Sequence, residues 1–231
     1  MATSSLAQTS TQRYSAVKYI APFVLFLAVL GLFGYLPLEP GWTAPLWFVI
    51  FVPVCAICWP REISLRPRHW MASTAVGAGV FVLWVAPEIL IGGYRSLPPF
   101  SNSLIGHIHS SMPAAALHSS WVLAWRTARA VMIVPIVEEL FWRGWLMRWL
   151  INTDFERVPL GMYAPFAFWV TALMFGSEHG PYWDVGLIAG VIYNLWMIRS
   201  KSLADCILMH AVTNAMLSVY VIGGQHWQYW Q

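Results

Sequence analysis

The feature that most constrains this chain is a succession of long apolar segments that contain almost no charged residues. A helix needs about 20 mainly apolar residues to cross a bilayer core of about 30 Å. Segments near this length recur along the chain, and Pro residues and short polar stretches separate them. They predict an all-α, polytopic transmembrane bundle of about seven or eight spans. The expected spans are roughly residues 19–38, 44–59, 70–91, 120–147, 160–178, 183–198 and 202–223.

The composition excludes the main alternatives to a helical membrane protein. The chain is 58% hydrophobic and 10% charged, so it lacks the polar surface that a soluble protein of 231 residues needs. Its net charge of +3 is small and scattered, which leaves no basic surface for a nucleic acid. The apolar segments are continuous rather than alternating, which disfavours a β-barrel.

One stretch leaves the number of spans open. Residues 92–120 are rich in Ser, Pro and His, and they either form a loop or contain an eighth segment around residues 104–117. With seven spans, the positive-inside rule predicts a cytoplasmic N-terminus and an external C-terminus. The predicted cytoplasmic side then collects most of the basic residues and leaves Arg95 outside. These residues are Arg13, Lys18, Arg61, Arg66, Arg68, Arg148, Arg157, Arg199 and Lys201.

The fourth predicted span carries charges inside apolar sequence. Glu138, Glu139 and Arg143 lie within VPIVEELFWRGW. Each charge costs roughly 2.5–3.5 kcal/mol at a helix centre, so such residues face partners or a cavity. Glu139 and Arg143 are four residues apart and can pair on one helix face, whereas Glu138 lies about 100° around the helix. We therefore expect a structural ion pair beside a free, functional carboxylate.

Two further predicted spans supply imidazole and amide groups. Phe175 and His179 are four residues apart, and so are His210 and Asn214. A lone His in a span commonly forms a hydrogen bond between helices. Two His, a Glu and an Asn on three spans are harder to explain by helix contacts alone. Together they provide a group to deprotonate water and donors for an oxyanion, as amide hydrolysis requires.

These three motifs, in this order, resemble those of the CAAX protease and bacteriocin-processing family of intramembrane endopeptidases. The resemblance covers roughly residues 125–220, and the stretches VEELFWRGWLMRWL and DFERVPLG are most similar to an exosortase-associated bacterial branch. It implies a catalytic core at 121–223. A polar N-terminal tail at 1–18, spans and a loop without a recognised motif at 19–120, and an aromatic tail at 224–231 complete the chain.

The resemblance also implies roles for the motif residues. Glu138 would activate water with help from His179, and His210 and Asn214 would bind the oxyanion. Glu139, Arg143 and Phe175 would support them. An alternative makes Glu138, His179 and His210 ligands of Zn²⁺, because three protein ligands leave a position open for water. We favour a metal-free site, since the metalloprotease motif H-E-x-x-H is absent.

The expected partners are the bilayer and a membrane-associated protein or peptide substrate, with no nucleic acid. The resemblance adds components of an exosortase system and a location in the bacterial cytoplasmic (inner) membrane. Arg126 and Arg129 are expected in or near the bundle, where they could steer a substrate. A non-proteolytic assembly factor or transporter is the remaining alternative, although the internal repeat typical of transporters is not visible.

Overall fold

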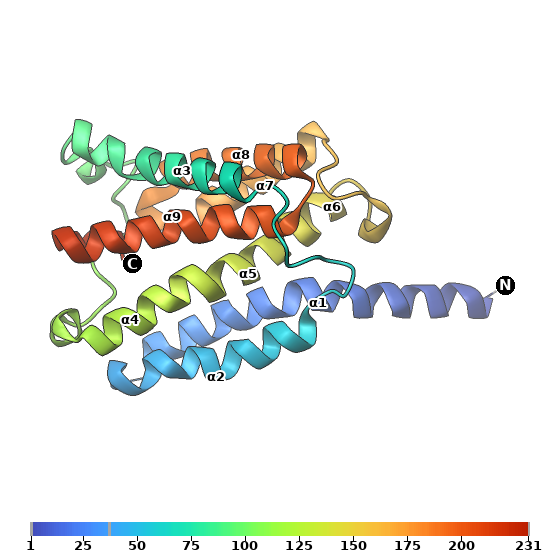
Figure 1. Cartoon of the computed structure of the whole chain (residues 1–231), viewed down its shortest axis with the longest axis horizontal. Helices are drawn as coiled ribbons and strands as arrows, with labels where there is room; N and C mark the ends of the chain where they lie inside the picture. The colour runs from blue at the N-terminus through green and yellow to red at the C-terminus, as the bar shows by residue number, and fades with distance from the viewer. Residues whose placement is uncertain (1, 37, 231) are drawn as a thin grey trace.

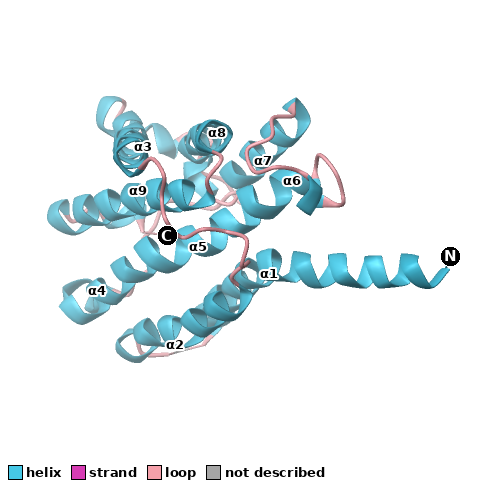
Figure 2. Ribbon diagram, turned by 45° about the vertical axis from the view of Figure 1, so that its right-hand side comes forward, coloured by secondary structure: helices cyan, strands magenta, loops and turns pink. Residues whose placement is uncertain are grey.

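The computed structural model describes residues 2–36 and 38–230, and within them the chain is helical apart from loops and one isolated bridge between Asn102 and Gly106 (Figure 2). The helices run roughly along one another in a bundle, and the start of α1 extends beyond it (Figure 1). The longer helices are α1 (Ala2–Tyr35), α2 (Pro40–Cys58), α3 (Trp70–Leu90), α7 (Pro165–Ser177), α8 (Trp183–Ser200) and α9 (Leu203–Gly224). One further helix runs through α4 (Ser120–Ala128), η3 (Arg129–Ile133), α5 (Val134–Glu139), η4 (Leu140–Leu146) and α6 (Met147–Trp149).

The prediction of a polytopic helical bundle is confirmed. Among the described residues, five helices are long and apolar enough to cross a membrane. They are Ser15–Tyr35 of α1, then α2, α3, the helix Ser120–Trp149, and α9. The helix α7 is apolar but only 13 residues long, and α8 is not among the five. The bundle therefore combines five membrane-length helices with two that pack among them.

The long stretch after α3 does not form an eighth helical pass. It contains only the short turns η1 (Tyr94–Ser96) and η2 (Ala114–His118), and loops connect them. The chain consequently makes seven passes along the bundle. Its N-terminal end and its C-terminal end lie at opposite ends of the molecule (Figure 1).

The helix Ser120–Trp149 departs from α-helical geometry near its middle. The segment η3 is π-helical, and the N–H of Val134 donates to the carbonyl of Arg129, five residues earlier. The next residue, Pro135, has no N–H, so neither it nor Val134 can satisfy the carbonyl of Ala130. The Nδ2 of Asn214 donates to that carbonyl at 2.7 Å. The irregular segment therefore fixes where α9 meets this helix.

Small residues allow the closest helix contacts. A Cβ built on Gly77 of α3 would lie 2.4 Å from the carbonyl oxygen of Met209 in α9, so only glycine permits this approach. The hydroxyl of Thr213 donates to the carbonyl of Gly77 at 3.0 Å across the same contact. Gly190 plays the same part between α8 and α7, where its Cβ would lie 3.0 Å from the carbonyl oxygen of Ala172.

A buried arginine anchors the loop after α3 to the start of α8. Arg95 is 1% exposed, and its Nη1 donates to the carbonyl of Pro181 at 2.6 Å and to Oδ1 of Asp184 at 2.8 Å. The hydroxyl of Tyr94 donates to the other oxygen of Asp184 at 2.7 Å. The short turn η6 (Gly180–Tyr182), which directly follows His179, is thereby fixed.

Candidate active site

A buried ion-pair network connects the helix Ser120–Trp149 with α8 and α9. Arg143 Nη1 lies 3.0 Å from Glu139 Oε1, and its Nε donates to Asn194 Oδ1 at 3.0 Å. The same Glu139 oxygen lies 3.0 Å from Nδ1 of His210. The Glu139 and Arg143 side chains are fully buried, so this carboxylate is compensated by two partners. Because Nδ1 of His210 faces a carboxylate, it carries a proton, and Nε2 is left for the cavity.

The neighbouring carboxylate has a different environment. Glu138 is 9% exposed, and its Oε2 is buried with no hydrogen-bond partner among the described residues. Its electrostatic neighbours are Glu178, Glu139 and Arg143, and none of them forms an ion pair with it in the described part of the chain. The 100° separation along the helix thus places one carboxylate in the network and the other beside the cavity.

His179 lies just after α7, where the chain turns toward α8. Its Nδ1 is 2.7 Å from the carbonyl oxygen of Phe175. A carbonyl only accepts, so Nδ1 is the protonated nitrogen and Nε2 of the neutral ring can accept a proton. The imidazole is packed between the rings of Phe175 and Trp84, with centroid distances of 4.9 and 5.2 Å. These contacts fix both the tautomer and the orientation of the ring.

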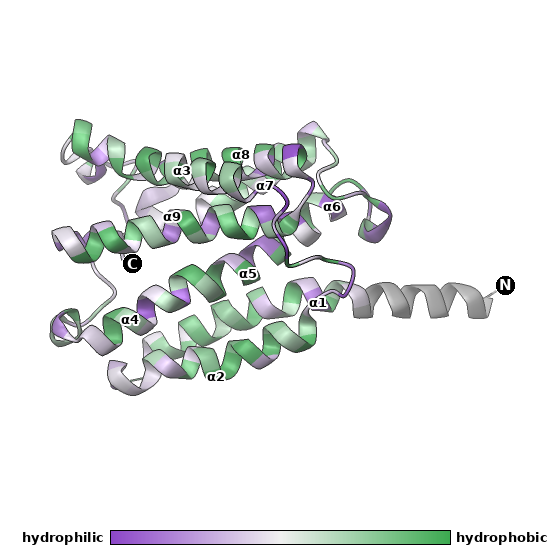
Figure 3. Ribbon diagram, viewed as in Figure 1, coloured by the Kyte–Doolittle hydropathy of each residue, from purple (hydrophilic) through white to green (hydrophobic). Residues whose placement is uncertain are grey.

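The motif residues meet at one cavity of about 250 Å³. Its lining includes Glu138, His179, His210 and Asn214. Hydrophilic residues of α4 and α5 interrupt the otherwise mainly apolar helix Ser120–Trp149 (Figure 3). The sequence predicts these residues on different spans, and the fold brings them to one cavity.

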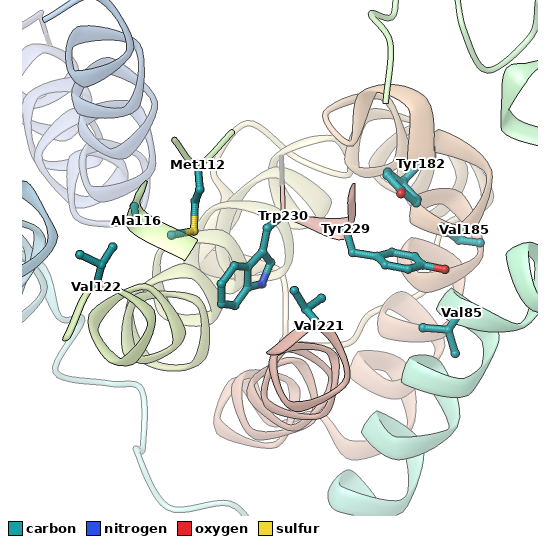
Figure 4. Close-up of a cluster of buried hydrophobic side chains, with 9 residues drawn as sticks. All are labelled: Val85, Met112, Ala116, Val122, Tyr182, Val185, Val221, Tyr229 and Trp230. Carbon is teal, nitrogen blue, oxygen red and sulfur yellow. The ribbon is translucent and has the colours of Figure 1, made fainter. Parts of the chain in front are cut away.

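The C-terminal tail closes one end of the cavity. Tyr229 and Trp230 line it. Trp230 lies between Met112 of the loop before η2 and Val221 of α9, and Tyr229 points to the side of Tyr182 (Figure 4). The N–H of Ser111 donates to the carbonyl of Trp230 at 2.9 Å. This end of the bundle is the one opposite the N-terminus (Figure 1).

Other residues at the site were not among the predicted ones. Glu178 is an electrostatic neighbour of Glu138, and the acid directly before His179 in the sequence was the available signal. Gly186 packs on His179, since a Cβ there would lie 3.0 Å from Nδ1. Trp84 comes from α3, outside every recognised motif, and only the fold brings it to His179.

Phe175 occupies the centre of the site rather than its margin. Its ring lies 4.5 Å from the guanidinium of Arg143 and 6.2 Å from the ring of His210, measured to the centroids. Its carbonyl holds His179, as described above. One residue therefore links the ion-pair network to the imidazole on the opposite wall.

The alternative zinc ligands all line the cavity, but they do not form a tight cluster. In the part of the chain that the structure describes, no group of three or more His, Cys, Asp or Glu residues has an arrangement that could hold a metal ion. Glu138, His179 and His210 each line the cavity, and Nδ1 of His210 is already engaged by Glu139.

Comparison with known proteins gives one match. Residues 119–216 match the family model described as type II CAAX prenyl endopeptidase Rce1-like. No curated protein and no solved structure matches the chain significantly. The matched segment contains Glu138, His179, His210 and Asn214. Over residues 119–216, this chain is therefore similar to the Rce1-like family of CAAX proteases.

Proposed function

We propose that the protein is an intramembrane endopeptidase that hydrolyses a peptide bond of a membrane-associated protein substrate with water activated by Glu138 and His179. The observation that carries the proposal is the contrast between the two adjacent glutamates. Glu139 is held by Arg143 and His210, whereas Glu138 lines the cavity with a buried oxygen that lacks a hydrogen-bond partner among the described residues. A carboxylate in this position is suited to accept a proton from water.

The proposed reaction uses both walls of the cavity. Glu138 takes a proton from water while the water oxygen attacks the peptide carbonyl carbon, and the carbonyl oxygen gains a negative charge. The C–N bond then breaks as the amine nitrogen receives the proton from Glu138. Nε2 of His179 can accept a hydrogen bond from the same water, because Nδ1 donates to Phe175.

The oxyanion is proposed to lie near His210 and Asn214. His210 donates from Nε2 only as an imidazolium, in which Nδ1 still donates to the Glu139 carboxylate. The amide of Asn214 has two N–H bonds, and one is used by the carbonyl of Ala130. The second remains available to the substrate, so the pair can supply two donors to developing negative charge.

The test is a Glu138→Gln variant, which keeps the size of the side chain but removes the base. Purified protein in nanodiscs would be assayed with fluorescence-quenched peptides that contain an apolar segment. We expect normal membrane insertion and a decrease in turnover of about 10²–10⁴, the usual contribution of a general base. The exposed Glu39→Gln is the matched control and should keep wild-type turnover. Undiminished turnover in Glu138→Gln would refute the base assignment.

We propose that the reaction needs no metal, and this can be measured separately. The expected zinc content of purified protein is well below one ion per chain, and turnover should survive chelators. One zinc per chain, with activity lost on chelation and restored on readdition, would instead favour the ligand set Glu138, His179 and His210. His210→Ala would then abolish bound metal, whereas Asn214→Ala would leave it.

The finer biology is also a proposal. We infer a location in the bacterial cytoplasmic membrane and a substrate from an exosortase-linked sorting system, on the resemblance of the sequence stretches described first. Comparing the membrane proteome of a deletion strain with that of a strain carrying Glu138→Gln would test this. Shared accumulation of uncut sorted proteins is expected, and accumulation of unrelated membrane proteins would contradict the link.

A further inference from the structure

A second cavity adjoins the first, and two arginines stand at the junction. It has a volume of about 610 Å³ and an apolar lining from α1, α2, α4 and the loop before η2. Leu30, Arg126 and Arg129 line both cavities. The two guanidiniums are therefore the charged groups that a molecule extending from the catalytic cavity into the apolar one would meet first.

Arg129 forms no ion pair with an acidic side chain in the described part of the chain. Its guanidinium lies 4.4 Å from the ring centroid of Trp47, and no ion pair of the described residues includes it. Glu138 lines the same cavity, but its electrostatic neighbours are Glu178, Glu139 and Arg143. An arginine inside a membrane bundle is costly without an anion or water, and such residues typically mark a substrate path.

Arg126 lies one turn earlier on the same face. Its Nη2 donates to Ser111 Oγ at 3.0 Å, and its guanidinium lies 5.1 Å from the ring centroid of Trp230. The charge of Arg129 acts on Arg126, so the two groups concentrate positive potential at one place. Planar guanidiniums bind carboxylates through paired hydrogen bonds, which makes a carboxylate the matching ligand.

The spacing along the helix sets where that carboxylate would lie in a substrate. Arg129 precedes Glu138 by nine residues, which corresponds to about 13 Å of helix. An extended peptide covers about 3.3–3.6 Å per residue, so this distance corresponds to roughly four residues. A peptide cut beside Glu138 could thus place a carboxylate beside Arg129 without leaving the joined cavities.

We propose that Arg126 and Arg129 form a specificity subsite for a carboxylate of the peptide substrate, about four residues from the scissile bond. The proposal rests on the endopeptidase function proposed above. The carboxylate is supplied either by the end of the substrate chain or by an Asp or Glu side chain. In both cases the two arginines at the junction of the cavities orient the substrate so that its anionic part points away from Glu138.

Binding is tested in the Glu138→Gln background, so that it does not depend on turnover. The probes are labelled apolar peptides in four forms: free-acid or amide ends, each with Asp or Asn about four residues from a fixed central bond. The affinities would be measured in nanodiscs of neutral lipid. We expect one carboxylate to strengthen binding at least about 30-fold, the low end for a buried charge pair. Tighter binding of the free-acid peptides than of the amides would identify the chain end as the recognised carboxylate. Tighter binding of the Asp peptides than of the Asn peptides would identify the side chain.

The carboxylate preference is the ratio of the affinities of the charged and the neutral peptide. Arg129→Gln and Arg126→Gln should lower this ratio toward one, whereas Arg129→Lys should retain part of it because the charge remains. Arg157→Gln removes the same charge at the other end of the bundle, where the side chain is 78% exposed, and should keep the full preference. Each variant would be checked for monodispersity and thermal midpoint, and Arg129→Lys covers the case in which Arg129→Gln does not fold.

Three results would overturn the subsite. Equal binding of all four peptides by the Glu138→Gln protein would show that no carboxylate is recognised. An equal loss for charged and neutral peptides in Arg129→Gln would indicate a packing role only. An effect of Arg129→Gln that requires anionic lipid in the nanodisc, and not a peptide carboxylate, would assign the arginines to lipid headgroups. Intact carboxylate preference with no cleavage by the wild-type chain would instead contradict the endopeptidase proposal alone.

Discussion

At the scale of single residues, the two glutamates show how position on a helix sets chemical character. Glu138 and Glu139 are sequence neighbours, yet Glu139 is fully buried between Arg143 and His210 while Glu138 lines a cavity. Exchanging their environments would require only a 100° rotation of the helix. The partners of Glu139 are therefore as important to the proposed mechanism as Glu138 itself, because they hold the helix in one rotation.

Gly186 offers a test of how His179 is positioned. In Gly186→Ala the new Cβ would lie 3.0 Å from Nδ1 of His179, so the ring must shift and its 2.7 Å contact with Phe175 must weaken. Small misplacements of a catalytic group can cost about 10²-fold, and we expect kcat to fall by 10- to 100-fold. The helix itself should not be weakened, since alanine is favoured over glycine in a helix interior.

The matched control for that variant is Gly79→Ala in α3, where an added Cβ meets nothing within 4 Å. Turnover and the thermal midpoint should both stay near wild type. The informative result for Gly186→Ala is lower kcat at an unchanged or higher thermal midpoint. Wild-type kcat in that variant would contradict a role of His179 in the reaction.

At the scale of elements, the π-helical segment η3 joins the helix Ser120–Trp149 to α9. Pro135 leaves the carbonyl of Ala130 without a helical donor, and Asn214 supplies one. Asn214→Ala should therefore cost about 1–3 kcal/mol of unfolding free energy, the cost of an unsatisfied buried acceptor. If the second N–H also serves the oxyanion, kcat should fall by about 10²–10³.

A double-mutant cycle separates these two contributions. Pro135→Ala restores an N–H that can reach Ala130, so the stability cost of Asn214→Ala should shrink by about 1 kcal/mol in that background. The loss of kcat should persist, because the new N–H does not face the substrate. Unfolding in mixed detergent micelles and peptide turnover give the two readouts. Recovery of turnover together with stability would show that Asn214 acts only by joining the helices.

At the scale of the whole molecule, several of the segments that carry basic residues outside the membrane-length helices lie at one end. The N-terminus, the loop before α3, the segment between α6 and α7 and the turn between α8 and α9 lie together, opposite the C-terminal tail (Figure 1). Lys and Arg in short loops remain on the cytoplasmic side. This arrangement supports the expected orientation, in which the proposed active site lies toward the external end.

Reporter fusions would test that orientation. A reporter that works only in the cytoplasm should be active when it is fused in the loop 59–69. A reporter that works only outside should be active when it is fused in the loop 91–119 or at the C-terminus. Replacing Arg61, Arg66 and Arg68 with Gln should weaken the preference, because these charges help to retain the loop. A cytoplasmic C-terminus in a chain with seven passes would mean that the whole assignment is inverted.

The sequence alone determined the class of the fold and the identity of the polar groups inside it. Continuous apolar segments require helices, since no other open structure satisfies its backbone in a bilayer. The spacing of Glu139 and Arg143 predicted their ion pair, because residues four apart lie next to each other on the same face of a helix. The order of the motifs predicted a resemblance to the CAAX protease family, which the match over residues 119–216 confirms.

Only the tertiary structure decided what the polar groups contact across helices. His210 meets Glu139, Asn214 meets the carbonyl of Ala130, and Trp84 meets His179, although no local period links these positions. Likewise, the loop 91–119 could not be distinguished from a membrane segment until its contacts with the C-terminal tail were known. The physical reason is that helix rotation and contact between distant segments depend on packing of the whole bundle, whereas hydropathy and helical period are properties of each segment alone.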